Sequence, residues 1–181
     1  MIDRSIYLEK LQRWQNKDVI KVVTGVRRCG KSTLLKLFAD QLKDNGVDDA
    51  RIITLNLEQL ENESLLDYHA LHDEILGRVN GAEMHYVFID EVQNVPNFQK
   101  AIDSLYTRDN IDLYITGSNA ILLGGNLATL LSGRYIEINM MPLSFAEYVS
   151  ANQSSDSVSR LYSRYISQSS FPATVDFAQD S

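Results

Sequence analysis

Cysteine and long apolar runs are almost absent from this sequence. The 181 residues include a single cysteine, Cys29, which cannot form an internal disulfide. We therefore expect a protein of the reducing cytoplasm. No stretch approaches the roughly 18 uninterrupted apolar residues of a membrane span, and residues 1–14 lack the apolar core of a secretory signal. Neither a membrane location nor secretion is predicted.

Basic residues are outnumbered by acidic ones. Lysine and arginine total 17 against 24 aspartates and glutamates, which gives a formal net charge of −7. Domains that hold nucleic acid by bulk electrostatics usually carry a basic excess. Nucleic-acid binding is therefore not supported by this segment, although the composition still allows a local basic patch.

The histidines His69, His72 and His85 have no cysteines at metal-ligand spacing, so no zinc site is expected.

Short apolar, β-branched runs alternate with segments of helical periodicity. Strands are expected at 19–24, 51–57, 86–89, 113–116 and 135–138. Helices are expected near 7–14, 32–44, 64–79, 98–105 and 120–131, with shorter ones after the capping box Ser144–Glu147 and around Leu161. Strands that alternate with helices predict a parallel sheet joined by right-handed crossovers. The serine-rich stretch 150–157 is typical of a loop or linker.

A glycine-rich segment follows the first predicted strand. Gly25-Val-Arg-Arg-Cys-Gly-Lys-Ser32 matches G-x-x-x-x-G-K-[ST], the phosphate-binding or Walker A loop. Its glycines let backbone amides curl around a polyphosphate, the following helix directs free N–H groups at it, and the lysine adds charge. A chance match in an ordinary turn is the alternative, but the position between strand and helix favours phosphate. The predicted nucleotide-binding residues are Gly25, Val26, Arg27, Arg28, Cys29, Gly30, Lys31, Ser32 and Thr33.

Two adjacent carboxylates, Asp90 and Glu91, follow the third predicted strand, in the manner of a Walker B motif. Beside a phosphate loop, Asp90 can hold a water of the Mg²⁺ shell, and Ser32 offers its hydroxyl to the same ion. Glu91 can orient the water that attacks the γ phosphate or accept its proton. Taken alone, such a pair is more often a solvated turn. With the loop, the pair predicts Mg²⁺ as cofactor and Lys31 and Glu91 as catalytic residues.

Five ordered motifs resemble one protein family. TGVRRCGKSTLL, VFIDEVQNV, ITGSNAILL, LSGRYIEI and MPLSFAEY, within about residues 5–150, are similar to the AAA+ superfamily of P-loop ATPases. The residues of these motifs most resemble those of one branch of the superfamily. It consists of predicted bacterial and archaeal ATPases that usually continue into a carboxy-terminal domain of uncertain function. The resemblance implies a three-layer α/β sandwich whose five-stranded, mainly parallel sheet has the order 5-1-4-3-2. It also implies ATP, rather than GTP, as the nucleotide.

Two further catalytic residues are implied by the resemblance. Asn119, or Ser118 beside it, would face the γ phosphate as a sensor, because in this family the preceding strand lies between the phosphate-loop strand and the Asp-Glu strand. Arg134 would act as an arginine finger on the nucleotide of a neighbouring subunit, which predicts a homo-oligomer. Simpler roles stay open for both: Asn119 caps the following helix, and Arg134 forms a surface ion pair.

Several residues near the loop have roles that the sequence leaves open. Arg27 and Arg28 are solvated, or they touch phosphate or a partner subunit. Tyr7 and Trp14 pack in the core or flank an adenine, as the segment before the first strand often does in AAA+ proteins. Cys29 packs as a small apolar residue, at a place where oxidation could block nucleotide entry.

We divide the chain into three parts. Residues 1–17 form a helix that flanks the core, 18–149 form the ATPase domain, and 150–181 form a polar linker and the start of a truncated lid or carboxy-terminal region. The predicted function is Mg²⁺-dependent hydrolysis of ATP to ADP and phosphate, which drives a conformational change in an attached or partner effector domain. The alternatives are a nucleotide-dependent switch with little turnover and a nucleic-acid-associated remodelling or defence component.

Overall fold

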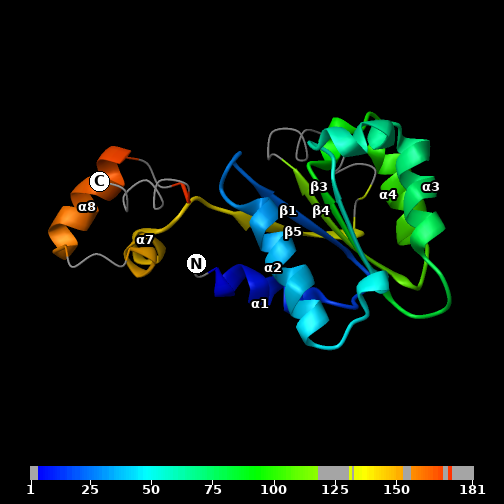
Figure 1. Ribbon diagram of the computed structural model, residues 1–181, viewed down its shortest axis with the longest axis horizontal. Helices are drawn as coiled ribbons and strands as arrows, with labels where there is room; N and C mark the ends of the chain where they lie inside the picture. The colour runs from blue at the N-terminus through cyan, green and yellow to red at the C-terminus, as the bar shows by residue number, and fades with distance from the viewer. Residues whose placement is uncertain (1–3, 118–130, 132, 153–155, 169–170, 173–181) are drawn as a thin grey trace.

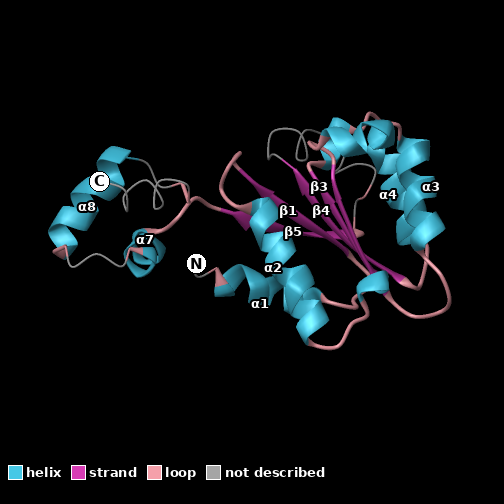
Figure 2. Ribbon diagram, in the orientation of Figure 1, coloured by secondary structure: helices cyan, strands magenta, loops and turns pink. Residues whose placement is uncertain are grey.

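The predicted strands pair into one sheet. The computed structural model describes residues 4–117, 131, 133–152, 156–168 and 171–172. Within these ranges five parallel strands lie in the order β2-β3-β4-β1-β5. Figure 2 shows the strands in magenta, with helices around them. Their bounds are β1 Ile20–Gly25, β2 Ile52–Asn56, β3 His85–Asp90, β4 Ile111–Gly117 and β5 Tyr135–Met140. The predicted fold class and strand order are confirmed.

Helices cover both faces of the sheet, which gives the core three layers (Figure 1). On one face lie α1 (Ser5–Trp14) and α2 (Lys31–Asp44). On the other lie α3 (Tyr68–Arg78) and α4 (Phe98–Tyr106). Short 3-10 helices occur at η1 Asp49–Arg51, η2 Leu60–Leu66 and η3 Val92–Asn94. None of the helices in the described ranges is both long and apolar enough to cross a membrane.

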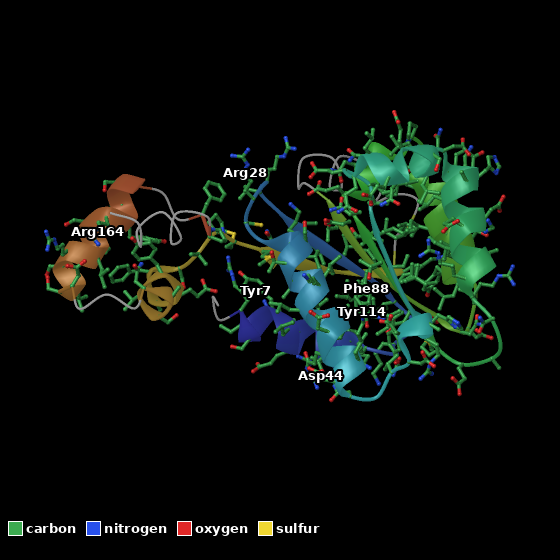
Figure 3. All side chains as sticks on the ribbon, viewed as in Figure 1. Tyr7, Arg28, Asp44, Phe88, Tyr114 and Arg164 are labelled. Carbon is green, nitrogen blue, oxygen red and sulfur yellow. The ribbon has the colours of Figure 1, made fainter. Side chains whose placement is uncertain are left out.

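Neighbouring residues of the central strands face opposite layers. In β1, Val22 packs toward α3 and α4, whereas Val23 packs toward α1 and α2. On the face that α1 and α2 cover, Phe38, Phe88 and Tyr114 form an aromatic cluster with ring centroids 6.2, 5.3 and 4.8 Å apart. Figure 3 labels Phe88 and Tyr114 of this cluster. Full burial of one such side chain stabilises the fold by about 1.5–3 kcal/mol. Two buried faces explain why these strands are continuous apolar runs.

The helix predicted at 64–79 begins later than expected. The chain first forms the 3-10 helix η2 and then extends at Asp67, where α3 begins. The Asp67 carboxylate accepts hydrogen bonds from the amides of His69 at 2.9 Å and Ala70 at 3.1 Å. This N-cap sets the start of α3, because the Asp67 carboxylate bonds first-turn amides that have no carbonyl partner within the helix. The apolar periodicity alone gives no sign of this boundary. The predicted start was therefore wrong.

The chain leaves the sheet after β5 and forms a separate helix pair, α7 (Phe145–Ala151) and α8 (Val158–Gln168), beyond the end of the sheet (Figure 1). The predicted capping box is confirmed: Ser144 N–H donates to Glu147 Oε2 at 2.7 Å, and Glu147 N–H donates to Ser144 Oγ at 3.3 Å. Tyr148 and Leu161 are buried between the two helices. Since α7 includes residues 150–151, the serine-rich loop starts later than predicted.

Candidate functional site

The phosphate-loop sequence forms a tight turn between β1 and α2. At Gly25, an added Cβ would lie 2.4 Å from the Met140 carbonyl oxygen and 2.8 Å from Cys29 Sγ, so only glycine fits. Gly30 has a φ of 103°, a left-handed conformation that glycine adopts without strain, and α2 begins at the next residue. The first amides of a helix have no carbonyl partner within it, so α2 presents N–H groups to this turn.

Lys31 joins the loop to the end of β3. Its side chain is 3% exposed, and Nζ lies 3.4 Å from Glu91 Oε1. The same nitrogen lies 3.4 Å from the Gly25 carbonyl oxygen and 3.5 Å from that of Val26. All three distances are long for hydrogen bonds, so none of these partners holds the ammonium tightly. A buried cation and a buried carboxylate thus face each other beside the loop.

One hydroxyl bonds both residues of the Asp-Glu pair, the carboxylate of Asp90 and the backbone N–H of Glu91. Thr116 Oγ1 donates to Asp90 Oδ1 at 2.5 Å and accepts from Glu91 N–H at 2.9 Å. Glu91 has a left-handed φ of 55°, and its other carboxylate oxygen, Oε2, accepts from Gln93 Nε2. Sequence reasoning missed Thr116. Its one signal was a polar residue near the end of an otherwise apolar strand.

The strand register places these groups at one edge of the sheet. β4 lies between β1 and β3, with Thr24 opposite Gly117 and Ile89 opposite Ile115. The loop after β1 and the carboxylates after β3 therefore meet at the carboxyl ends of the strands, where open α/β sheets bind their ligands. Ser118 and Asn119 follow β4 directly but lie outside the described residues.

The middle of the loop is exposed. Val26, Arg27 and Arg28 all face solvent, and Figure 3 shows Arg28 at the outer side of the loop. Arg27 Nη2 lies 2.8 Å from Glu58 Oε1, in an exposed ion pair of the kind that stabilises a fold little. No described contact ties these arginines to the buried lysine.

Ser32 and Thr33 are exposed in the first turn of α2, which begins directly after the loop. Cys29, in contrast, is fully buried among the side chains that α1 and α2 cover. Burial raises the pKa of its thiol, which keeps the sulfur protonated and poorly reactive. Oxidation of Cys29 therefore requires the loop to open first.

Arg134 lies at the amino ends of the strands, whereas the loop of its own chain lies at their carboxyl ends. Arg134 directly precedes β5, whose first residue, Tyr135, pairs with Ile20, and whose last residue, Met140, pairs with Gly25. Five residues of strand separate the two ends by roughly 17 Å. Its guanidinium forms an ion pair with Asp103. Arg134 therefore lies too far along the strand to contact the loop of its own chain.

Tyr7 packs against the α1–α2 side of the core, and its hydroxyl accepts a hydrogen bond from Met141 N–H at 3.1 Å. Trp14 is half-buried at the end of α1.

His85 is buried, with Nδ1 2.8 Å from the Glu83 carbonyl oxygen and Nε2 accepting from Asn80 N–H at 3.3 Å. Among the described residues, no three or more His, Cys, Asp and Glu side chains group closely enough to hold a metal by themselves.

Comparison with known proteins agrees with this architecture. Residues 17–149 match the family described as AAA domain. An uncharacterized protein of Haemophilus influenzae is 44% identical over 179 residues, which are 97% of this chain and 45% of that protein. The chain thus spans less than half the length of this relative.

Solved structures show the same fold at low sequence identity. A Walker-type ATPase of Pyrococcus abyssi superposes with a TM-score of 0.64 at 16% identity, over 97% of this chain and 65% of that one. The ORC1 protein of Aeropyrum pernix, in complex with DNA, gives 0.59 at 13% identity, over 83% and 48%. The family match covers most of the chain, and the strand order is that of P-loop ATPases. The chain therefore belongs to the AAA+ family of P-loop ATPases.

Proposed function

We propose that this chain binds ATP with Mg²⁺ at residues 25–33 and hydrolyses it to ADP and phosphate. The observation that carries the proposal is the approach of Lys31 Nζ to within 3.4 Å of Glu91 Oε1, directly beside the glycine turn. Backbone N–H groups and a buried ammonium suit phosphate oxygens, while Asp90 and Glu91 suit a hydrated metal and a reacting water. The residues present therefore fit a magnesium-triphosphate ligand.

Binding would begin with the loop. The amides of the loop and of the first turn of α2 would surround the β and γ phosphates, and Lys31 would exchange its long contacts for phosphate oxygens. The exposed Ser32 hydroxyl and, through water, Asp90 would hold Mg²⁺, which neutralises charge on the β and γ oxygens when bound. Thr116 would keep Asp90 aimed at that position.

Glu91 would act on the attacking water. Once Lys31 pairs with phosphate, the Glu91 carboxylate loses its cationic neighbour and can accept the water's proton. The water oxygen then bonds to the γ phosphorus as the bond to the bridging oxygen breaks, and ADP leaves. Two carboxylates in separate roles suit water as nucleophile better than a bound hydroxyl.

The remaining predicted residues enter as parts of the same proposal. Asn119 would contact the γ phosphate, and Arg134 would reach the nucleotide of a neighbouring subunit. The exposed ion pair of Arg134 with Asp103 is weak enough for a phosphate to displace it. We further propose the division into 1–17, 18–149 and 150–181, with turnover coupled to an effector domain. The Haemophilus influenzae relative is longer than the matched part, which leaves length for a further domain in that protein.

A nucleotide-dependent switch with little turnover is the second candidate. The observation that favours it is the double engagement of Glu91, whose oxygens contact Lys31 and Gln93. A carboxylate held in this way must be released before it can accept a proton. Slow release would leave bound nucleotide, rather than hydrolysis, as the functional signal.

Phosphate release and nucleotide binding by Glu91→Gln test the proposal. We expect hydrolysis to fall about 100-fold or more, because a general base contributes about 10²–10⁴ to the rate, while nucleotide binding persists. Glu74→Gln is the matched control, since Glu74 lies on α3 in an exposed pair with Arg78. If the parent and Glu91→Gln bind but neither hydrolyses, the switch is favoured. If the parent does not bind nucleotide, the assignment of the loop is wrong.

A further inference from the structure

An arginine just before α1 joins three segments that are distant in the sequence. Arg4 is 7% exposed. Its Nη2 donates to the Cys29 carbonyl oxygen at 3.1 Å, in the phosphate loop, and to the Met141 carbonyl oxygen at 3.2 Å, after β5. Its Nη1 donates to Glu147 Oε1 at 3.1 Å, on α7. One buried guanidinium therefore contacts the loop, the exit from the sheet and the helix pair.

The bond to Cys29 bears on phosphate binding. A peptide unit is planar and trans, so the Cys29 C=O and the Gly30 N–H point in opposite directions. A guanidinium that fixes the carbonyl also fixes the direction of this amide. The Gly30 amide lies in the part of the loop that would face a phosphate. Arg4 therefore positions a binding group without touching the ligand.

The bond to Glu147 bears on α7. Glu147 is the capping-box residue, and its other oxygen accepts from Ser144 N–H at 2.7 Å. The same carboxylate thus sets the start of α7 and receives the Arg4 charge. Tyr7 adds a second tie, because its hydroxyl accepts from Met141 N–H at 3.1 Å while Arg4 binds the Met141 carbonyl. Arg4 and Tyr7 together hold both polar backbone groups of the residue that follows β5.

The segments beyond the sheet also approach the loop directly. An added Cβ at Gly30 would lie 3.4 Å from Met140 Cε and 3.8 Å from Pro172 Cγ. Met140 is the last residue of β5, and Pro172 comes after α8. Side chains from just before and just after the helix pair in the sequence therefore lie close to Gly30, where they would feel a movement of the loop.

We propose that Arg4 is a positioning residue that couples the phosphate loop to the helix pair α7–α8. A phosphate that binds the Gly30 amide shifts the Cys29 carbonyl with it, because the two belong to one peptide unit. Arg4, bonded to that carbonyl, passes the shift to Glu147 and hence to α7. The inference rests on the proposed function, since it takes the loop as the nucleotide site. The charged partners are largely buried, so neither can leave the other without cost.

Amide hydrogen exchange in α7, measured with and without Mg²⁺ and ADP, tests the coupling. We expect ADP to change exchange at residues 145–151 of the parent. In Glu147→Gln, ADP should bind within about threefold of the parental affinity, because its carboxylate does not contact the loop, yet the α7 response should be lost. In Arg4→Gln, affinity should fall about tenfold, as for loss of a hydrogen bond from a charged group, and saturating ADP should leave α7 unchanged.

Arg51→Gln is the matched control, because Arg51 forms an ion pair of similar length, 3.0 Å to Glu83, far from the loop along the sheet. It should keep the parental affinity and the α7 response. A purely structural role for Arg4 would lower the melting temperature but leave the α7 response to saturating ADP intact.

The outcomes separate the two proposals. A parent that binds no ADP refutes the proposed function. A parent that binds ADP without a response in α7, or variants that respond as the parent does, overturn the coupling and leave the proposed function standing. If Arg4→Gln does not fold, Glu147→Gln decides, since it keeps the size of the side chain and its capping geometry.

Discussion

Thr116 is the residue on which the geometry of the candidate site depends most directly. Its hydroxyl bonds both Asp90 and the backbone of Glu91 in a buried position. We expect Thr116→Val to lower the free energy of unfolding by about 1–3 kcal/mol, because it leaves two buried polar groups without this partner. Phosphate release should fall about tenfold or more, since small misplacements of catalytic groups are costly, while nucleotide binding is largely kept.

Urea unfolding and phosphate-release assays measure both effects. Thr54→Val is the control, because it is the same substitution at an exposed position of another strand, β2. Equal behaviour of the two variants would show that the Thr116 hydroxyl does not organise the carboxylates.

The residues that sequence reasoning found and those it missed differ in the range of their contacts. Lys31, Asp90 and Glu91 belong to local motifs whose spacing the chemistry of phosphate binding dictates. Thr116 meets its partners 25 and 26 residues away, and Arg4 meets Glu147 across 143 residues. Only the folded chain brings such groups together, so neither role was visible in a local pattern.

At the level of elements, Asp67 decides where α3 begins. Its carboxylate accepts from two amides of the first turn. Asp67→Ala should lower the free energy of unfolding by about 1 kcal/mol, whereas Asp67→Asn should recover most of that loss, because asparagine is an equally good N-cap. Urea unfolding followed by circular dichroism measures both. Identical stability of the alanine and asparagine variants would contradict a capping role.

Periodicity predicted which elements exist more reliably than where they begin. The apolar spacing through Leu65 and Leu66 continues into α3, so the pattern alone could not reveal that the chain extends at Asp67. The start of α7 was predicted correctly because both partners of its capping box, Ser144 and Glu147, lie three residues apart. A boundary is thus readable from sequence when its hydrogen-bonding groups form a known local pattern.

For the molecule as a whole, alternation of strands and helices predicted a parallel sheet, and the family resemblance supplied its order. The placement of the α7–α8 pair was not predicted, because it depends on tertiary contacts of Arg4 and Tyr7 with the chain after β5. Arg4 links the core to this pair, because it contacts the phosphate loop, the chain after β5 and α7. A ligand in the loop should therefore stabilise the whole chain rather than one element.

Thermal unfolding with and without Mg²⁺ and ATP tests that consequence. Ligand at about 100 times its dissociation constant stabilises the native state by about 2.7 kcal/mol, which raises the melting temperature of a chain this size by about 5–10 °C. Lys31→Ala should lose most of this shift, because Lys31 is the buried cation of the loop. Lys36→Ala, an exposed position on the same helix, should keep it. Each variant is compared with itself, with and without ligand. The loss of stability caused by leaving Glu91 without its cation is present in both measurements and so cancels. A full shift in Lys31→Ala would place the nucleotide elsewhere and refute the loop as its site.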